Sequence, residues 1–300
     1  MSINLVTKYV PYLDKKLAYE SRTSVLDTNK DLIKETADAK TIMIASLAMS
    51  GLGDYSRSTG FDAGSVNLTW TSYTFNYDRS VEFSIDAMDD AESLGILFGN
   101  LAGEFLRTKV APEIDAIRFA TYAQKQGYTV ADANYDASTI AGAIDTGLVA
   151  MEDNEVPMDD IVIFITPTNY KFLKESSLWD RPLAPSENPN RNFGSYDGHE
   201  IVKVPQSRFY SKVTLYDGST AGQTDGGYVK ADDGKNINFA LISKRSVIQI
   251  SKHAVLKTFT PEENQKKDAY LIQYRVYHDA WVLGNKDEGV YVSCADESTD

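Results

Sequence analysis

The stretch LTWTSYTFNYDRSVEFSIDAMDDAESLGILFGNLAGEFL, residues 68–106, joins the two patterns that decide the fold. Its first half alternates apolar and polar residues, which predicts β-strands with one exposed face. The alternation changes phase at Thr71–Ser72, and this slip predicts a bulge or bend in a long, hairpin-like ribbon over 51–88. Because an isolated ribbon is only marginally stable in water, we expect it to pack on another subunit.

The second half of this stretch predicts the start of a long helix. Asp89 can cap its N-terminus, and Glu92 stands three residues later, in the capping-box position. Apolar residues then recur at helical spacing, so a helix over 89–126 would be roughly 55 Å long. Pro112 should kink this helix or divide it in two. A helix of this length predicts an elongated subunit.

The residues before the ribbon predict an arm without a core of its own. Val6–Glu20 has apolar residues at helical spacing, and TIMIASL at 41–47 predicts a short strand. A polar stretch of mixed charge separates the two. We therefore expect 1–50 to take its packing from elsewhere.

The residues after the long helix predict an α/β region. Helices are expected over 138–151 and 167–175, the second opened by Pro167. The remaining expected elements are strands at 160–166, 201–204, 238–242, 254–259, 270–283 and 289–293, a proline-containing loop at 176–200 and a glycine-rich flap at 217–234. No internal repeat or low-complexity tract interrupts them.

Composition excludes several classes of protein. The chain has 300 residues, of which 42% are apolar and 24% charged, as in globular proteins. Its apolar runs are all shorter than the ~18 residues that a membrane-spanning helix needs. The N-terminus lacks the pattern of a signal peptide, so we expect synthesis in the cytoplasm. The single cysteine, Cys294, excludes an intramolecular disulfide framework.

The net charge of −13 is concentrated in one part of the chain. Residues 51–160 hold 6 basic and 19 acidic residues, while the parts before and after them are nearly neutral. Proteins that grip nucleic acid usually carry basic patches that neutralise phosphates. The chain has no basic cluster, so DNA near it would meet a neutral or repelling surface.

No motif of catalysis, cofactor binding or metal binding is complete. GLGDYS at 51–56 begins like a dinucleotide fingerprint, but Ser56 occupies the place of the third glycine. DANYDA at 132–137 begins like a calcium loop, but Ala137 stands where glycine is needed. The three histidines are far apart and form no known pattern: His199, His253 and His278. We expect no enzyme, no cofactor and no metal; the alternative is a soluble α/β enzyme with a site in 160–245.

These parts, in this order, resemble the major capsid proteins of tailed bacteriophages, which have the Hong Kong 97-type fold. The resemblance covers nearly the whole chain. The segments that carry it are GLGDYSRSTGF (51–61), LTWTSYTFNYDRSVEFSIDAMDDAES (68–93), VAPEIDAIRFATYAQ (110–124), VPMDDIVIFITPTNYKFLKES (156–176), VPQSRFY (204–210) and YRVYHDAWVLGNKDEGVYV (274–292).

The resemblance implies an α+β fold of four parts. An N-terminal arm would cover 1–50 and an extended loop 51–88. A peripheral domain on a long spine helix would cover 89–135 and 245–300, and an axial domain 136–244.

The resemblance also implies a function. Pentamers and hexamers of the chain would close an icosahedral shell around packaged double-stranded DNA, together with a portal. The protein would then be part of the virion, made in the cytoplasm of a bacterial host and in contact with no membrane. An encapsulin-type nanocompartment shell, which shares the fold and encloses cargo enzymes, is the alternative.

In this reading the extended loop contacts neighbouring subunits. The rings and cations expected at that interface are Tyr55, Arg57, Phe61, Trp70, Tyr73, Phe75, Tyr77 and Arg79. Arg79 is expected to pair with an acid across the interface. Some relatives carry a cleaved N-terminal scaffold, but here the arm reaches the ribbon within 50 residues, so we expect a separate scaffolding protein.

Some relatives also link their subunits by an isopeptide bond from a lysine of the extended loop. No lysine lies between Lys40 and Lys109 in this sequence. We therefore expect a shell held by non-covalent contacts or by a separate cement protein.

Overall fold

The computed structural model describes residues 20–27, 33–35, 40–55, 57–58, 60–61, 63–88, 96–128, 133–176, 195–284 and 286–296. The chain forms two compact units. Residues 29–78 make the smaller unit, and 1–28 together with 79–300 make the larger one.

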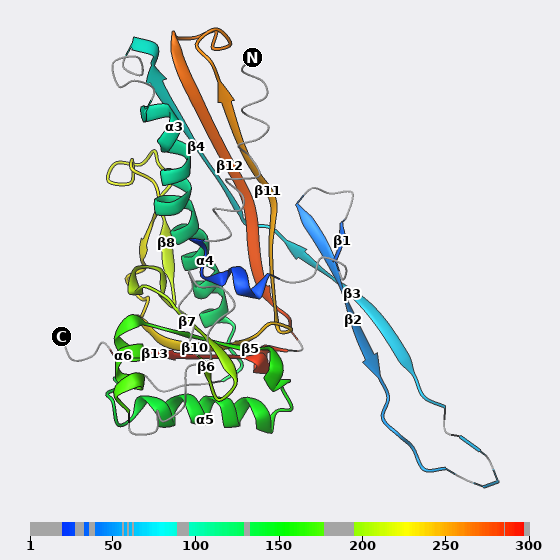
Figure 1. Cartoon of the computed structure of the whole chain (residues 1–300). Helices are drawn as coiled ribbons and strands as arrows, with labels where there is room; N and C mark the ends of the chain where they lie inside the picture. Colours follow the sequence, from blue (N-terminus) through cyan, green and yellow to red (C-terminus); the bar gives the residue numbers. More distant parts are fainter. Residues whose placement is uncertain are drawn as a thin grey trace. The chain divides into compact units, whose positions relative to one another are not determined.

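A five-stranded sheet forms one half of the larger unit (Figure 1). Its strands, in spatial order, are β13 (Val290–Cys294), β10 (Ile237–Ser243), β5 (Ile161–Ile165), β7 (His199–Lys203) and β6 (Ser195–Tyr196). Every residue of the central strand β5 is buried, as its unbroken apolar run predicts. It pairs antiparallel with β10 and parallel with β7.

Helices cover both faces of this sheet. On one face, α5 (Ile140–Asp153) and α6 (Pro167–Glu175) pack against Ile161, Ile163 and Ile165. On the other, Phe119 and Tyr122 pack against the alternate residues of β5. Thr166 caps α6 by accepting a hydrogen bond from the backbone N–H of Asn169, so the proline-opened helix is confirmed.

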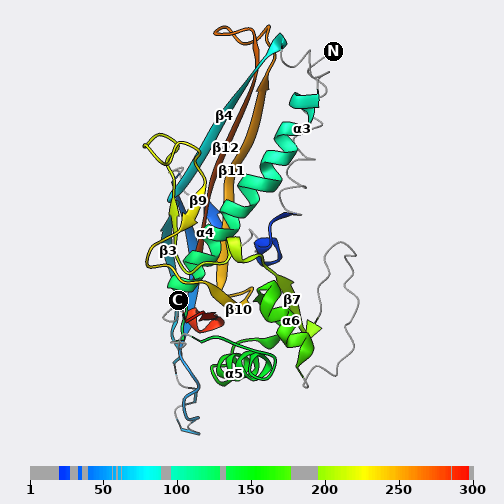
Figure 2. The same ribbon diagram turned by 90° about the vertical axis from the view of Figure 1, so that its left-hand side faces the viewer.

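A long three-stranded sheet forms the other half of the larger unit. Its order is β11 (Val247–Phe259), β12 (Ala269–Val282) and β4 (Tyr77–Asp86). A continuous helical run lies along one face in both views (Figures 1 and 2), and consists of α3 (Ile96–Phe105), the π-helical segment Leu106–Val110 and α4 (Ala111–Gln124). Its apolar side packs on the inner face of the sheet.

Smaller elements complete the larger unit. A hairpin of β8 (Val213–Leu215) and β9 (Tyr228–Lys230) carries the loop 216–227. The flap expected at 217–234 therefore includes strand β9, and from here on the name flap is used for the loop 216–227 alone. Four glycines of the flap have positive φ, and their lack of a Cβ permits this conformation: Gly218, Gly222, Gly226 and Gly227. Single 3₁₀ turns lie at Thr23–Leu26, Met158–Asp160, Gln206–Arg208 and Asp287–Gly289.

The smaller unit is a three-stranded antiparallel sheet of β1 (Ile33–Glu35), β2 (Thr41–Met49) and β3 (Val66–Thr74). β2 and β3 pair over nine residues and form a long hairpin (Figure 1). Across this hairpin the register is unbroken.

The structure corrects the ribbon expected within 51–88. β3 pairs with β2, a strand assigned to the arm, and β4 belongs to the long sheet. No bulge lies at Thr71–Ser72. The change of phase has another cause, because the two apolar sets lie on opposite faces of β3: Tyr73 is opposite the buried Ile42, whereas Leu68 is opposite the exposed Leu47.

Two further expectations concern β13 and Pro112. The strand expected at 289–293 is β13, and it lies at the edge of the five-stranded sheet beside β10. Pro112 was expected to kink the long helix or divide it in two; it lies in the first turn of α4, directly after the π-helical segment that separates α3 from α4, and the helical run continues past it. Asp89 and Glu92, expected to cap the helix, lie outside the described residues, as do nearly all of the expected arm helix and most of the loop 176–200. Among the described residues, no helix is long and apolar enough to span a membrane.

Candidate assembly surface

The exposed large apolar side chains of the described residues gather on the hairpin of the smaller unit. Eight of them lie between β2 and the end of β3: Leu47, Met49, Leu52, Tyr55, Phe61, Val66, Leu68 and Trp70. Outside this unit, only Met88, Val149 and Val229 are comparable in the described part of the chain. A gathered apolar surface of this kind marks an interaction site more often than scattered apolar residues do.

The strand register places these residues on one face. Leu47 lies opposite Leu68, Met49 opposite Val66, and Ala45 opposite Trp70. Directly opposed residues of an antiparallel pair share a face, so these six residues form one continuous surface, which we call the apolar ladder. The other face carries Ser46, Ala48, Asn67 and Thr69 over the same length.

The tip of the hairpin adds two aromatic rings. Tyr55 and Phe61 meet edge to face with their centroids 5.2 Å apart, and 91% of Phe61 is exposed. Arg57, between them in sequence, is also exposed. The ammonium of Lys34 lies 5.7 Å from the Trp70 ring centroid.

The other rings expected at an interface are less accessible. Phe75 is buried, and its backbone N–H donates to the carbonyl of Lys40, so it holds the base of the hairpin together. Tyr73 and Tyr77 are half-buried. Sequence reasoning missed Leu47, Met49, Val66 and Leu68, although their alternation along the two strands was visible.

Arg79 also differs from expectation, because its guanidinium is bound within its own chain. Its Nε donates to Oε1 of Glu113 at 2.6 Å, and its Nη1 donates to the carbonyl of Tyr216 at 2.8 Å. A weaker bond reaches the carbonyl of Gly227 at 3.3 Å. Within the chain, Arg79 thus joins β4 to α4 by an ion pair and to the flap by hydrogen bonds.

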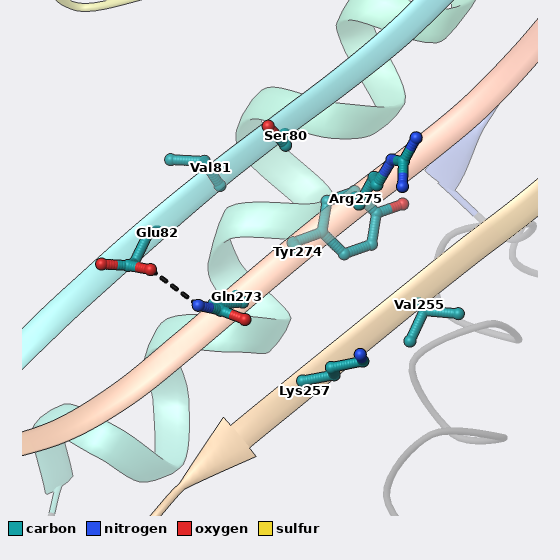
Figure 3. A pocket seen from close by; sticks show the side chains of 8 residues that line it. All are labelled: Ser80, Val81, Glu82, Val255, Lys257, Gln273, Tyr274 and Arg275. Carbon is teal, nitrogen blue, oxygen red and sulfur yellow. Dashed lines mark hydrogen bonds between the residues drawn. The ribbon is translucent and has the colours of Figure 1, made fainter. Parts of the chain in front are cut away.

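Two hollows lie on the surface of the larger unit. The smaller one, of about 450 Å³, lies on the outer face of the long sheet, and Figure 3 shows the side chains that line it. Its lining is polar and mixed in charge, with Lys257, Arg275 and Glu82, and Gln273 donates to Glu82 at 2.7 Å. Among the described residues no group of three potential metal ligands occurs.

The larger hollow, of about 1230 Å³, lies between the helical run and the flap. Three arginines of its wall are paired within the chain: Arg79 with Glu113, Arg107 with Glu104, and Arg208 with Asp115. Burial raises the pKa of Tyr228 in its wall to about 12, so this phenol stays protonated and donates to the carbonyl of Ser207.

No protein-family model matches the sequence, and no curated protein matches it. Solved structures do match the fold. The head structure of the Helicobacter pylori bacteriophage KHP40 is 13% identical with a TM-score of 0.58, over 92% of this chain and 90% of that one. The capsid of the cyanophage P-SCSP1u is 15% identical with a TM-score of 0.56, over 93% and 88%. The mature capsid of bacteriophage PhiM1 is 13% identical with a TM-score of 0.52, over 87% and 84%. The chain has a phage capsid fold.

The phage capsid fold confirms the resemblance and the mixed α+β architecture expected from the sequence. Identities this low establish the fold and no more. The quoted segments 110–124 and 156–176 are α4 and the β5–α6 unit, which form the contact between the five-stranded sheet and its helices.

Proposed function

We propose that this chain is the major capsid protein of a tailed bacteriophage, and that copies of it form a shell around packaged double-stranded DNA. The observation that carries the proposal is the phage capsid fold, which matches over about nine tenths of the chain. The neighbours are structural proteins, so the role is structural and not enzymatic.

The apolar ladder supplies a physical reason for assembly. Burial of one large apolar side chain stabilises a complex by roughly 1.5–3 kcal/mol. Leu47, Met49, Leu68 and their neighbours expose such surface together on one face. A second copy of the chain is the partner we assign to it, because a shell places the same surface beside every neighbour.

The parts of the chain take roles in this proposal. The smaller unit is the extended loop, the long sheet with its helical run is the peripheral part, and the five-stranded sheet with the flap is the axial part. In rings of five and six copies, the flap and the hairpin are the segments that we expect to differ most. Tyr55, Arg57, Phe61 and Trp70 remain candidate contacts, whereas Arg79 does not.

The charge of the chain fits enclosure of DNA without a grip on it. An acidic protein repels phosphates, so packaged DNA would be held by the closed shell and could later be released. We propose a separate scaffolding protein and a portal as further partners, and the virion as the final location after synthesis in the bacterial cytoplasm.

Substitutions on the two faces of β3 test the proposal. The double variant Val66→Ser with Leu68→Ser removes two exposed side chains of the apolar ladder, so the subunit should keep its fold and melting temperature. We expect the association constant for each contact between subunits to fall at least about tenfold, which corresponds to about 1.4 kcal/mol per contact. Fewer capsomers or shells should then form. Sedimentation velocity and negative-stain microscopy at matched concentrations give the measurement.

The matched control is Asn67→Ser with Thr69→Ser, on the opposite face of the same strand. It should assemble like the unmodified chain. Normal shells from the Val66 and Leu68 variant would contradict the role of the ladder. Particles that enclose a protein cargo in place of nuclease-resistant DNA would favour the nanocompartment alternative.

A further inference from the structure

The segment 20–27, which we call the strap, is held against α4 and β11 of the larger unit by buried polar groups. Thr23 is fully buried, and Leu26 belongs to the main apolar core. Gln249 of β11 donates from Nε2 to the carbonyl of Thr23 and to Oδ1 of Asp27, both at 2.6 Å. The strap is thus held in place by hydrogen bonds from Gln249 as well as by the apolar packing of Leu26.

Asp115 of α4 is the centre of this attachment. Its side chain is fully buried, and it accepts four hydrogen bonds from the strap. The donors are the hydroxyls of Ser21 at 2.7 Å and Thr23 at 2.8 Å, and the backbone N–H groups of Arg22 at 2.8 Å and Thr23 at 3.2 Å. Arg208 donates to it from outside the strap at 3.1 Å.

Arg118 lies three residues further along α4 and is also buried. Its Nη1 donates to the hydroxyl of Thr23 at 2.8 Å, and this hydroxyl donates in turn to Asp115. Its Nε has no hydrogen-bond partner among the described residues, and its ion pair with Asp27 is long, at 3.9 Å. The hydroxyl of Thr23 therefore bridges the buried carboxylate of Asp115 and the buried guanidinium of Arg118. The Nε–H of Arg118 remains as a donor without an acceptor among the described residues.

We propose that the strap is a releasable anchor, and that Arg118 is the reserve partner which binds Asp115 directly when the strap leaves. Residues three apart on a helix are neighbours on its surface, so a change of rotamer is enough to bring the two groups together. Arg208 contacts only Oδ2 of Asp115, whereas the donors on Oδ1 are all from the strap, so release would leave Oδ1 to be bound by Arg118. The N-terminal segment could then exchange between bound and free states with α4 intact.

This proposal rests on contacts within one chain and does not depend on the shell role. Hydrogen exchange of the full chain, followed by mass spectrometry, measures how often the strap opens. Thr23→Val removes the bridging hydroxyl and keeps the shape of the side chain. We expect the amides of Arg22 and Thr23 to exchange about tenfold faster, since a hydrogen bond to a charged group is lost. Thr23→Ser keeps the hydroxyl and should change the rate by less than about threefold.

Arg118→Met distinguishes a reserve partner from a simple holder of Thr23. Because Arg118 also bonds to Thr23 in the bound strap, its effect is measured in the Thr23→Val background, where that bond is absent. If Arg118 stabilises the released state by binding Asp115, adding Arg118→Met to Thr23→Val should slow exchange of the strap amides about threefold or more. Faster or unchanged exchange would overturn the proposal, because Arg118 would then act only on the bound strap or not at all. The amides of β5 serve as the internal reference for folding, and Arg118→Gln is the second variant if the methionine variant does not fold.

Discussion

His278 is a buried histidine on the inner face of β12, opposite Ser251 of β11. Burial lowers its pKa to about 3, and the positive charges of Arg118 and Arg79 act in the same direction. The side chain is therefore neutral in the folded chain at neutral pH. In the unfolded chain His278 takes up a proton near pH 6.5, whereas in the folded chain it stays neutral until about pH 3. The contribution of neutral His278 to stability is therefore complete above pH 6.5 and is lost as the pH falls toward 3, because protonation then favours the unfolded chain.

We expect His278→Gln to flatten the pH dependence of stability in this window. The unmodified subunit should lose up to about 1.4 kcal/mol per pH unit through His278 between pH 6 and 5, and the variant should not. Urea unfolding at pH 7, 6 and 5 gives the measurement. His199→Gln is the comparison: the pKa of His199 is lowered by burial but raised by Asp197, so its effect should be smaller. Equal slopes for the unmodified and His278 chains would contradict this account.

Other residues show why the sequence could not assign every side chain. Arg79 was visible only as a charge in a predicted strand, whereas its acceptors Glu113 and Tyr216 lie 34 and 137 positions further along the chain. Asp115 and Arg118 looked like polar members of a helix, and the strap that buries them precedes them by more than ninety residues. Local patterns contain no information on partners at such distances, and hence the strap was not predicted.

At the scale of elements, periodicity predicted most of the larger unit. β5, α6 and the helical run follow from apolar spacing and from Pro167 at the start of α6. Strand pairing was less predictable, because the alternation of residues along a strand indicates which face is apolar but does not indicate which other strand pairs with it. The hairpin illustrates this, since β2 and β3 are joined by a long connection and both carry exposed apolar residues.

The packing of α5 on the five-stranded sheet permits a paired test. A Cβ at Gly147 would lie 2.6 Å from Cδ1 of Leu241 and 3.1 Å from the ring of Tyr291, so the helix lies close to the sheet at this point. We expect Gly147→Ala to lower the free energy of unfolding by about 1–3 kcal/mol through overpacking. Urea unfolding of the unassembled subunit gives the measurement.

Gly142 on the same helix is the control. A Cβ there would meet no atom within 4 Å, so Gly142→Ala should only gain helix propensity and stabilise the chain by up to about 1 kcal/mol. If both variants changed stability in the same direction, the close approach of α5 to β10 and β13 would not explain the glycine at 147.

At the scale of the whole molecule, the distribution of exposed groups distinguishes the two units. The larger unit buries its apolar residues in three clusters around its two sheets. The smaller unit instead exposes the apolar ladder and the Tyr55–Phe61 pair. A chain with a complete core in one unit and an uncovered apolar face in the other is suited to assembly, in which neighbours cover what the single subunit leaves exposed.

The chemistry of the hairpin leads to the last prediction, that a shell formed by this chain, as proposed above, is held without covalent links between subunits. An isopeptide bond needs an amine that loses its proton and attacks a carboxamide. From β2 through the tip to the end of β3 the only base is Arg57, whose guanidinium stays protonated. Lys34 lies outside this stretch, on β1, and its Nζ is 5.7 Å from the centroid of the Trp70 ring.

A disulfide is equally disfavoured as a link. Cys294, on the edge strand β13, is the single cysteine, so at most one bond could join each pair of subunits, and the cytoplasm is reducing. Purified particles, boiled with reductant, should therefore run on a denaturing gel as one band near 33.3 kDa, the mass of the single chain. A ladder of higher bands would contradict the prediction, and mass spectrometry of linked peptides would then identify the lysine, with Lys34 and Lys40 the first to examine because they belong to the same unit as the hairpin.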